Sequence, residues 1–192
     1  MREITFKIEE KQDGLMIRDF LRNFGVSSAL LTKLKQDENE ISLNGEFAKA
    51  IAVLHTSDVL KIRIKNKGKM PEKFVCDKVR VAYDDEDILV LNKPPLMPVH
   101  ESRNHRGDTL ANVAACYMES DCAFRAVYRL DRDTSGLVLI AKNELAASKL
   151  AGKIKKDYYA IVKGKFEGEG TIDLPIRRVR ESIIERGVFD DG

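Results

Sequence analysis

A single carboxylate, that of Asp131, stands between two arginines, Arg129 and Arg132, in the segment YRLDRDTSGLVLIAK of residues 128–142. An aspartate acts as a nucleophile only when it is ionised, and a cation within about 4–6 Å lowers its pKa and keeps it so. On an extended backbone, residues i and i+2 project to the same side, which places Arg129 beside Asp131 and turns Arg132 away. The spacing therefore suits a nucleophilic aspartate, whereas a surface loop in which Asp131 pairs with an arginine is the simpler interpretation.

The residues after Asp131 predict that it lies on a loop at the mouth of a sheet. Thr134, Ser135 and Gly136 form a small polar turn, and the five residues from Leu137 to Ala141 are all apolar. An uninterrupted apolar run after a turn is typical of a strand buried on both faces. A reactive acid is effective on such a loop because the rigid scaffold holds it in place.

A second interpretation takes Asp131, Arg132 and Asp133 as a DxD metal clamp of a sugar-nucleotide transferase. Divalent ions require several oxygen ligands, and the acidic run at 84–87 could supply more of them. Against this interpretation, Arg132 opposes cation binding and the chain contains no glycine-rich phosphate loop. We therefore predict no metal site here.

Length and composition predict a protein of one medium or two small domains. The chain has 192 residues, 43% hydrophobic and 33% charged, with a net charge of +2. It contains no run near the ~18 apolar residues of a membrane span and no signal-peptide core, so we expect a cytoplasmic protein. The histidines and cysteines lack metal-ligand spacing, which predicts reduced thiols and no metal: His55, His100, His105, Cys76, Cys116 and Cys122.

Residues 1–65 predict a small module of helices and strands. Apolar residues at 17, 20, 21 and 24 follow the i, i+3, i+4, i+7 pattern of an amphipathic helix that ends at Gly25, and a second short helix follows through residue 34. Asn44-Gly45 within residues 41–47 predicts a hairpin. Residues 60–65 alternate apolar side chains with cations, which predicts a strand with one buried face and one basic face: Lys61, Arg63 and Lys65.

Residues 66–76 have the composition of a linker, and residues 77–192 predict a second domain. Expected strands span 79–83 and 88–91 around an acidic turn, then 137–141 and 158–164. Expected helices span 109–119, capped by Asp108, and 144–156. Strands outnumber helices without alternating with them, so the sequence predicts an α+β fold.

The segment RLDRDTSGL resembles the HRLDxxTSG signature of the Rlu-type RNA pseudouridine synthases. Four further segments resemble that family as well: DILVLNKP (87–94), PVH (98–100), GDTLANV (107–113) and KDYYAIVKG (156–164). The N-terminal module resembles the S-four-like RNA-binding domain that many members carry, so the resemblance covers residue 13 to the end. It implies a helix-plus-strand RNA-binding module at 1–65 and a mixed, mainly antiparallel-sheet catalytic domain at 77–192.

The resemblance implies isomerisation of uridine to pseudouridine in ribosomal or transfer RNA. Asp131 matches the catalytic aspartate, which attacks the ribose or helps to expel uracil, and Arg129 matches an arginine that helps open the RNA and pairs with the aspartate. Tyr158 matches a tyrosine that packs on the flipped base, whereas Tyr159 is expected to be a half-buried strand residue. Thr134, Ser135 and Gly136 would support the loop. Structured RNA is the expected partner, with no DNA, membrane or cofactor.

Two departures from the family pattern are visible. Tyr128 stands where the signature usually has histidine. The family also continues to a GRTHQIR-type motif, whereas this chain ends at GVFDDG, so we expect the 192-residue form to be truncated or degenerate and weakly active or inactive. The alternative is a non-catalytic RNA-binding protein that uses its basic strand to hold structured RNA.

Overall fold

The computed structural model describes residues 1–65, 67–119, 122–165, 167–180 and 185–189. The chain divides into two compact units, Met1–Lys155 and Lys156–Gly192. Within their described residues, the first combines four α-helices and one 3-10 helix with two antiparallel sheets, and the second contains a two-stranded antiparallel sheet. The fold is therefore α+β, as the sequence predicted.

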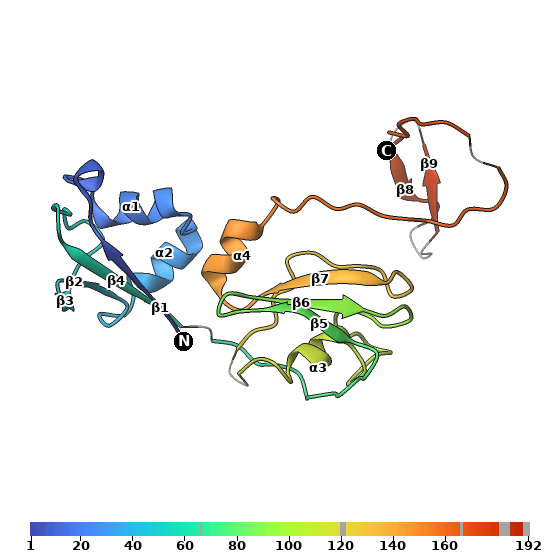
Figure 1. Ribbon diagram of the computed structural model, residues 1–192, viewed down its shortest axis with the longest axis horizontal. Coiled ribbons are helices and arrows are strands. Elements are labelled where there is room, and N and C mark those ends of the chain that lie inside the picture. The colour runs from blue at the N-terminus through green and yellow to red at the C-terminus, as the bar shows by residue number, and fades with distance from the viewer. Residues whose placement is uncertain (66, 120–121, 166, 181–184, 190–192) are drawn as a thin grey trace. The chain divides into compact units, whose positions relative to one another are not determined.

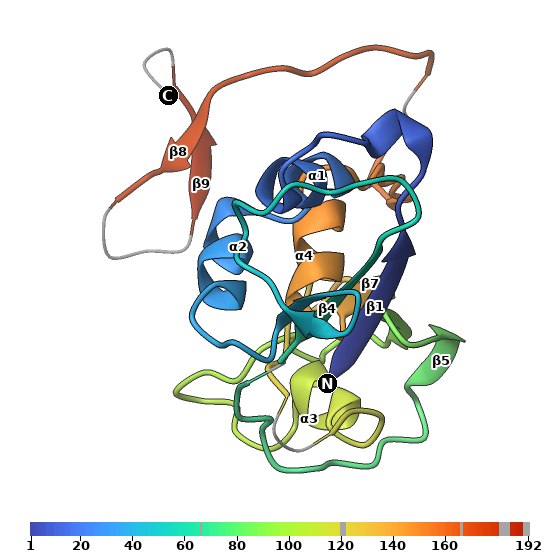
Figure 2. The same cartoon turned by 90° about the vertical axis from the view of Figure 1, so that its left-hand side faces the viewer.

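The N-terminal part of the first unit is a four-stranded antiparallel sheet in the order β1-β4-β2-β3. Helices α1 and α2 pack against one of its faces (Figure 2). The core between helices and sheet contains Ile17, Leu21, Leu31, Leu60 and Ile62, all buried. The elements are β1 (Arg2–Lys7), a 3-10 helix η1 (Glu10–Gln12), α1 (Ile17–Phe24), α2 (Ser28–Leu34), β2 (Ile41–Leu43), β3 (Glu46–Phe47) and β4 (Val59–Ile64).

Local signals account for most of these boundaries. Gly25 ends α1 with a φ of 105°, a left-handed conformation that glycine adopts without strain. The Ser27 side chain accepts a hydrogen bond from the Leu30 amide at 3.2 Å and caps α2. Asn44 and Gly45 both have positive φ, as the tight hairpin between β2 and β3 requires. These elements confirm the sequence prediction, which omitted β1.

The remainder of the first unit is built on a three-stranded antiparallel sheet in the order β5-β6-β7. These strands are β5 (Arg80–Asp84), β6 (Ile88–Lys93) and β7 (Gly136–Ala141), and helix α3 (Leu110–Ala114) lies against one face of the sheet (Figure 1). Val138 and Ile140 of β7 are fully buried in this core, but Leu137 is 53% exposed. The prediction that this strand is buried on both faces is therefore wrong for the described residues, because successive side chains point to opposite faces and the face that carries Leu137 and Leu139 is only partly covered.

Helices α3 and α4 (Glu144–Leu150) are shorter than predicted. After α3 the amides of Cys116 and Tyr117 bond three residues back, so the chain tightens into turns instead of continuing to 119. The N-cap of α3 is Thr109 and not Asp108. Helix α4 stops because Ala151 leaves the helical region and Gly152 has a φ of 71°.

Helix α4 packs against the N-terminal sheet module. Leu145 is buried in the core of that module, and the Lys149 ammonium lies 3.5 Å from the centre of the Phe24 ring. The hydroxyl of Ser148 donates to the Gly25 carbonyl at 3.2 Å. The expected linker also makes contacts, since Met70 is buried in the second core. Residues 1–155 therefore pack as one unit.

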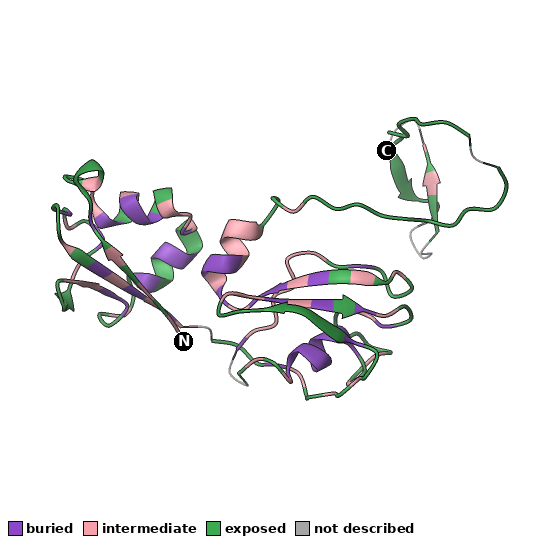
Figure 3. Cartoon of the chain, viewed as in Figure 1, coloured by how far each residue is buried: buried purple, intermediate pink, exposed green. Residues whose placement is uncertain are grey.

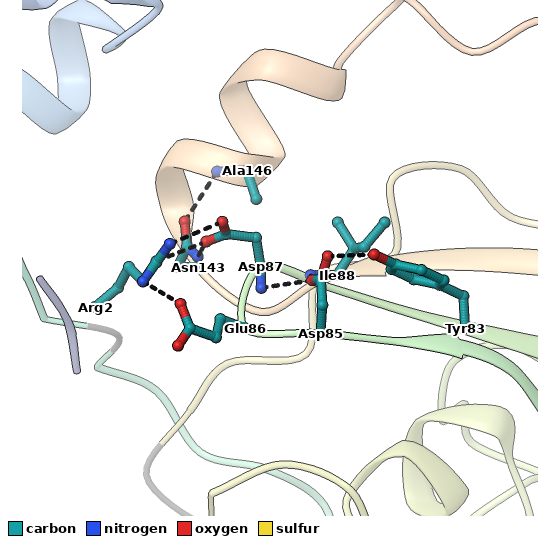
Figure 4. A network of polar contacts seen from close by, with 8 residues as sticks. All are labelled: Arg2, Tyr83, Asp85, Glu86, Asp87, Ile88, Asn143 and Ala146. Atoms are coloured by element: carbon teal, nitrogen blue, oxygen red, sulfur yellow. Dashed lines mark hydrogen bonds and ion pairs between the residues drawn. The ribbon is translucent and has the colours of Figure 1, made fainter. Parts of the chain in front are cut away.

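A polar network at the start of β1 also connects the N-terminal sheet module with α4 (Figure 4). Arg2 donates through Nε to Oδ1 of Asp87 at 3.0 Å and forms an ion pair with Glu86. The Asn143 amide donates to the same Asp87 oxygen at 2.7 Å, and Asn143 caps α4 by accepting from the Ala146 amide at 2.9 Å. Asp87 thus joins the first strand, the β5–β6 turn and the N-terminus of α4.

The second unit differs from the prediction. It contains a hairpin of β8 (Ile176–Arg178) and β9 (Arg186–Val188), whereas the described residues of the predicted strand 158–164 form neither helix nor strand. Tyr159 was expected to be half buried but is fully exposed, and this part of the chain is exposed almost throughout (Figure 3). Among the described residues of the whole chain, no helix has the length and apolar character needed to cross a membrane.

Candidate active site

Asp131 lies on an exposed loop that connects Ala126, which bridges to Ile140, with the start of β7. Its carboxylate forms no ion pair with any residue that the structure describes, and neither does the guanidinium of Arg129. Arg132 pairs instead with its neighbour Asp133, at 3.2 Å. The simple interpretation of Asp131 as half of a surface salt bridge is therefore wrong within the described chain.

The backbone of the loop is closed by a turn. The Thr134 amide donates to the Asp131 carbonyl at 3.2 Å, which makes Asp131 the first residue of a β-turn. Leu130, the preceding residue, is buried in the second core. Gly136 begins β7 with a φ of 133°, a conformation that strains any residue with a Cβ. The turn residues thus fix the direction in which the chain passes from Asp131 into the sheet.

Lys93, at the end of β6, is the main site residue that the sequence interpretation missed. Its side chain is fully buried, and its ammonium donates to three backbone carbonyls: Pro94 at 3.0 Å, Met97 at 2.8 Å and Arg132 at 2.9 Å. The last bond ties the Asp131 loop to the strand. The sequence pattern could have predicted the burial of Lys93, because it follows Leu89 and Leu91 at every second position along β6 and so shares their core-facing side.

The electrostatics of Lys93 also involve the loop. Burial lowers the pKa of the Lys93 ammonium below its usual value, because a charge out of water is destabilised. The carboxylates of Asp133 and Asp131 act in the opposite direction and favour the charged form. All three donors of Lys93 are used by carbonyls, so the lysine positions the loop without forming a hydrogen bond to the Asp131 carboxylate.

Tyr128, which replaces the signature histidine, closes the loop at its base. Its hydroxyl donates to the Leu137 carbonyl at 2.9 Å, and its ring packs against the second core. The bond links the residue before the loop with the second residue of β7. The structure therefore gives Tyr128 a positioning role at this site.

His100 lies close to the same loop. Its ring packs edge-to-face on Phe124, with 5.2 Å between the ring centroids. Burial lowers the pKa of the His100 imidazole, and the positive charge of Arg129 lowers it further. Sequence reasoning did not assign a role to His100.

The three cations expected to bind RNA lie on β4 and on the residue after it. Lys61 and Arg63 both pair with Glu3 of β1, at 2.9 and 2.8 Å, because the register of β1 places Glu3 opposite Arg63. Lys65 pairs with Asp37 and with Glu40, and these contacts raise its pKa. The basic face is thus partly neutralised by carboxylates that lie far away in the sequence.

The other predicted site features are placed as follows. Tyr158 belongs to the second unit, where its side chain is 59% exposed. Within the described ranges, no group of three or more His, Cys, Asp or Glu side chains is arranged to hold a metal ion. The DxD interpretation has a further difficulty, since Asp133 is engaged with Arg132.

The arrangement defines a class of site: one unpaired carboxylate on a loop fixed through its backbone, with an arginine nearby. Such a site suits nucleophilic attack on a polyanionic substrate. Residues 87–191 match the family model described as RNA pseudouridylate synthase. The chain belongs to this family.

Individual relatives agree with the family match. The chain is 34% identical over 189 residues to the uncharacterized RNA pseudouridine synthase YjbO of Bacillus subtilis, covering 93% of this chain and 66% of that protein. It is 33% identical over 164 residues to the ribosomal large subunit pseudouridine synthase D of Pseudomonas aeruginosa, covering 81% and 51% respectively. The chain thus spans less than two thirds of the length of these relatives. The family match begins at residue 87, so the RNA-binding role of residues 1–65 stays a prediction.

Proposed function

We propose that the protein isomerises uridine to pseudouridine in ribosomal or transfer RNA, with Asp131 as the nucleophile. The observation that carries the proposal is the unpaired Asp131 carboxylate, held on a pinned turn inside the segment that resembles the family signature. Family membership supports the reaction, and the name of the Pseudomonas aeruginosa relative supports ribosomal RNA as one substrate class.

The reaction exchanges one glycosidic bond for another. The bond between C1′ of the ribose and N1 of uracil breaks as Asp131 attacks C1′ or assists departure of the base. The freed uracil turns, C5 bonds to C1′, the hydrogen of C5 leaves as a proton, and N1 gains a proton. The atoms of product and substrate are the same, so the reaction itself requires no electron carrier or group donor.

Other residues are assigned roles around this step. The target uridine must leave its stack, at a cost of roughly a few kcal/mol, and Arg129 would help open the RNA. Tyr158 would pack on the flipped base, since an aromatic ring offers a flat surface to a uracil. Lys93, Tyr128 and the Thr134–Gly136 turn position the Asp131 loop. Residues 1–65 would hold structured RNA through Lys61, Arg63 and Lys65.

Loss of the C5 hydrogen gives a direct assay. RNA transcripts of ribosomal and transfer RNA, labelled with tritium at C5 of uridine, should release tritium when incubated with the protein. Asp131→Asn should reduce the rate by roughly 10³-fold or more, because an amide is a poor nucleophile. Asp133→Asn is the matched control. Its rate of tritium release should stay within about threefold of the parent rate, since the Asp133 carboxylate is engaged by Arg132. An active Asp131→Asn protein would refute the nucleophile. Because the 192-residue form is expected to be weakly active or inactive, the reaction is refuted when a form that continues through a GRTHQIR-type motif also releases no tritium from either RNA.

A further inference from the structure

A short hairpin with two arginines lies between His100 and α3. We name residues Glu101–Gly107 the arginine hairpin. The Ser102 amide donates to the His105 carbonyl at 2.9 Å, and the His105 amide donates back to Ser102 at 3.2 Å. Arg103 and Arg106 are exposed, and neither forms an ion pair with a residue that the structure describes. The hairpin thus presents two exposed guanidinium groups without ion pairs to described residues.

The base of the arginine hairpin is fixed by Asn112 of α3, whose side chain is fully buried. The Asn112 amide donates to Oε1 of Glu101 at 3.0 Å, and the Gly107 amide donates to the same oxygen at 3.1 Å. These bonds lower the pKa of the Glu101 carboxyl. Thr109 completes the arrangement by donating through its amide and hydroxyl to Oδ1 of Asn112, at 3.1 and 2.6 Å. One carboxylate therefore ties both ends of the hairpin to the helix.

The arginine hairpin begins beside the Asp131 loop. The Lys93 ammonium bonds both the Met97 carbonyl and the Arg132 carbonyl, so the chain that leads into the hairpin lies next to the loop. His100, the residue before the hairpin, lies near enough to Arg129 for the arginine charge to lower its pKa. Arg103, Arg106 and Arg129 thus project from two adjacent segments.

The chemistry of this surface fits a phosphate backbone. A guanidinium binds phosphate oxygens through parallel N–H donors. The tied base limits the conformational entropy that the hairpin loses on binding. The hairpin's single carboxylate, that of Glu101, is held by Asn112 and Gly107 and forms no ion pair with either arginine, although the charge of Arg106 also acts on it. The neighbouring Asp108 carboxylate pairs with His105 at 3.0 Å.

We propose that the arginine hairpin binds phosphates of the RNA strand that flanks the uridine at Asp131, through Arg103 and Arg106. The identity of the partner as RNA rests on the proposed function. This contact is sequence-independent, because phosphates are the same at every nucleotide. It is also separate from any contact made by β4, since it arises from the catalytic part of the chain.

The salt dependence of RNA binding tests the proposal. Each phosphate neutralised contributes about 0.7–0.9 to the slope of log affinity against log salt. Arg103→Gln with Arg106→Gln should therefore reduce the slope by about 1.4–1.8. Arg103→Lys with Arg106→Lys keeps both charges and should retain the slope. All variants are made in the Asp131→Asn protein, so that no turnover occurs, and binding is measured on the unlabelled transfer and ribosomal RNA transcripts.

The outcomes separate this proposal from the catalytic one. An unchanged slope in the glutamine variant, with an unchanged melting temperature, overturns the role of the arginine hairpin. The binding slope does not depend on catalysis. Failure of the reaction itself would appear only as absent tritium release from the protein that retains Asp131.

Discussion

Replacing Lys93 with methionine should loosen the Asp131 loop while keeping most of the side-chain volume. The bond from the ammonium to the Met97 carbonyl is buried, whereas the bonds to the Pro94 and Arg132 carbonyls are partly buried. Water can replace the lysine at the latter two positions but not at Met97. A buried acceptor left without a donor costs about 1–3 kcal/mol.

The ammonium also has to be removed from water on folding, and methionine avoids that cost. The two effects oppose each other, so we expect Lys93→Met to lower the free energy of unfolding by about 1–3 kcal/mol and not by the sum of three charged hydrogen bonds. For a unit of this size, each 1 kcal/mol lowers the melting temperature by about 2–4 °C. Without the bond to Arg132, the Asp131 turn should open more often.

Urea unfolding and amide hydrogen exchange measure these two effects separately. Exchange should accelerate at Thr134, whose amide closes the turn on Asp131. If the isomerase activity is as proposed, kcat should fall by about 10²-fold, because a small misplacement of a reacting group is enough for such a loss. Lys78→Met is the matched control on an exposed lysine. The role of Lys93 would be refuted if Lys93→Met kept a free energy of unfolding within about 0.5 kcal/mol of the parent and left exchange at Thr134 unchanged.

Three further predictions follow from named contacts. Tyr128→Phe loses an exposed bond to the Leu137 carbonyl, nine residues away, and should lower stability by about 0.5–1 kcal/mol in urea unfolding, whereas Tyr83→Phe, whose hydroxyl bonds the Asp85 carboxylate only two residues away, should change it less. Gly136→Ala should cost about 1–3 kcal/mol through backbone strain alone, because a Cβ there would meet only Leu130 at 3.6 Å; a thermal shift below 1 °C would contradict this. The pKa of Asp37 is lowered to about 2 by its hydrogen bond from Lys65, so its contribution to stability is complete above about pH 4 and is lost as the pH falls toward 2. The urea midpoint of the parent should therefore fall more than that of Asp37→Asn between those pH values. If the two midpoints fall in parallel with pH, the contact contributes nothing to stability.

Sequence periodicity predicted the elements whose signals are local. Helices α1 and α2, the Asn44-Gly45 hairpin and strands β4 to β7 lie within a few residues of the expected ranges. Helix ends were predicted less well, since α3 gives way to tighter turns and α4 ends at Leu150. The strand expected at 158–164 carries a suitable apolar pattern, but its side chains are exposed and the segment has no described strand partner. Strand propensity alone does not form a strand without a partner.

Charge distribution could not be predicted from nearby residues. The alternating cations of β4 and of the residue after it indicate a basic face. The neutralising carboxylate is Glu3, which is sixty residues away from Arg63 in the sequence but opposite to it across the sheet. Only the pairing register of β1 with β4 brings the two together. For the same reason the hydrogen bonds of Lys93 could not be predicted, because its three acceptors come from two separate segments of the chain.

The contacts of the Asp131 loop explain how a carboxylate can be held in place and still react. A side chain fixed by its own hydrogen bonds or ion pairs would have to break them to approach a substrate. In this loop the fixing contacts belong to the backbone and to neighbouring residues: Lys93 holds the Arg132 carbonyl, Tyr128 holds the Leu137 carbonyl and the Thr134 amide holds the carbonyl of Asp131 itself. Arg132, the adjacent cation, is engaged by Asp133. The backbone at Asp131 is therefore held while its carboxylate stays free of ion pairs with described residues, which suits the nucleophilic role that we propose for it.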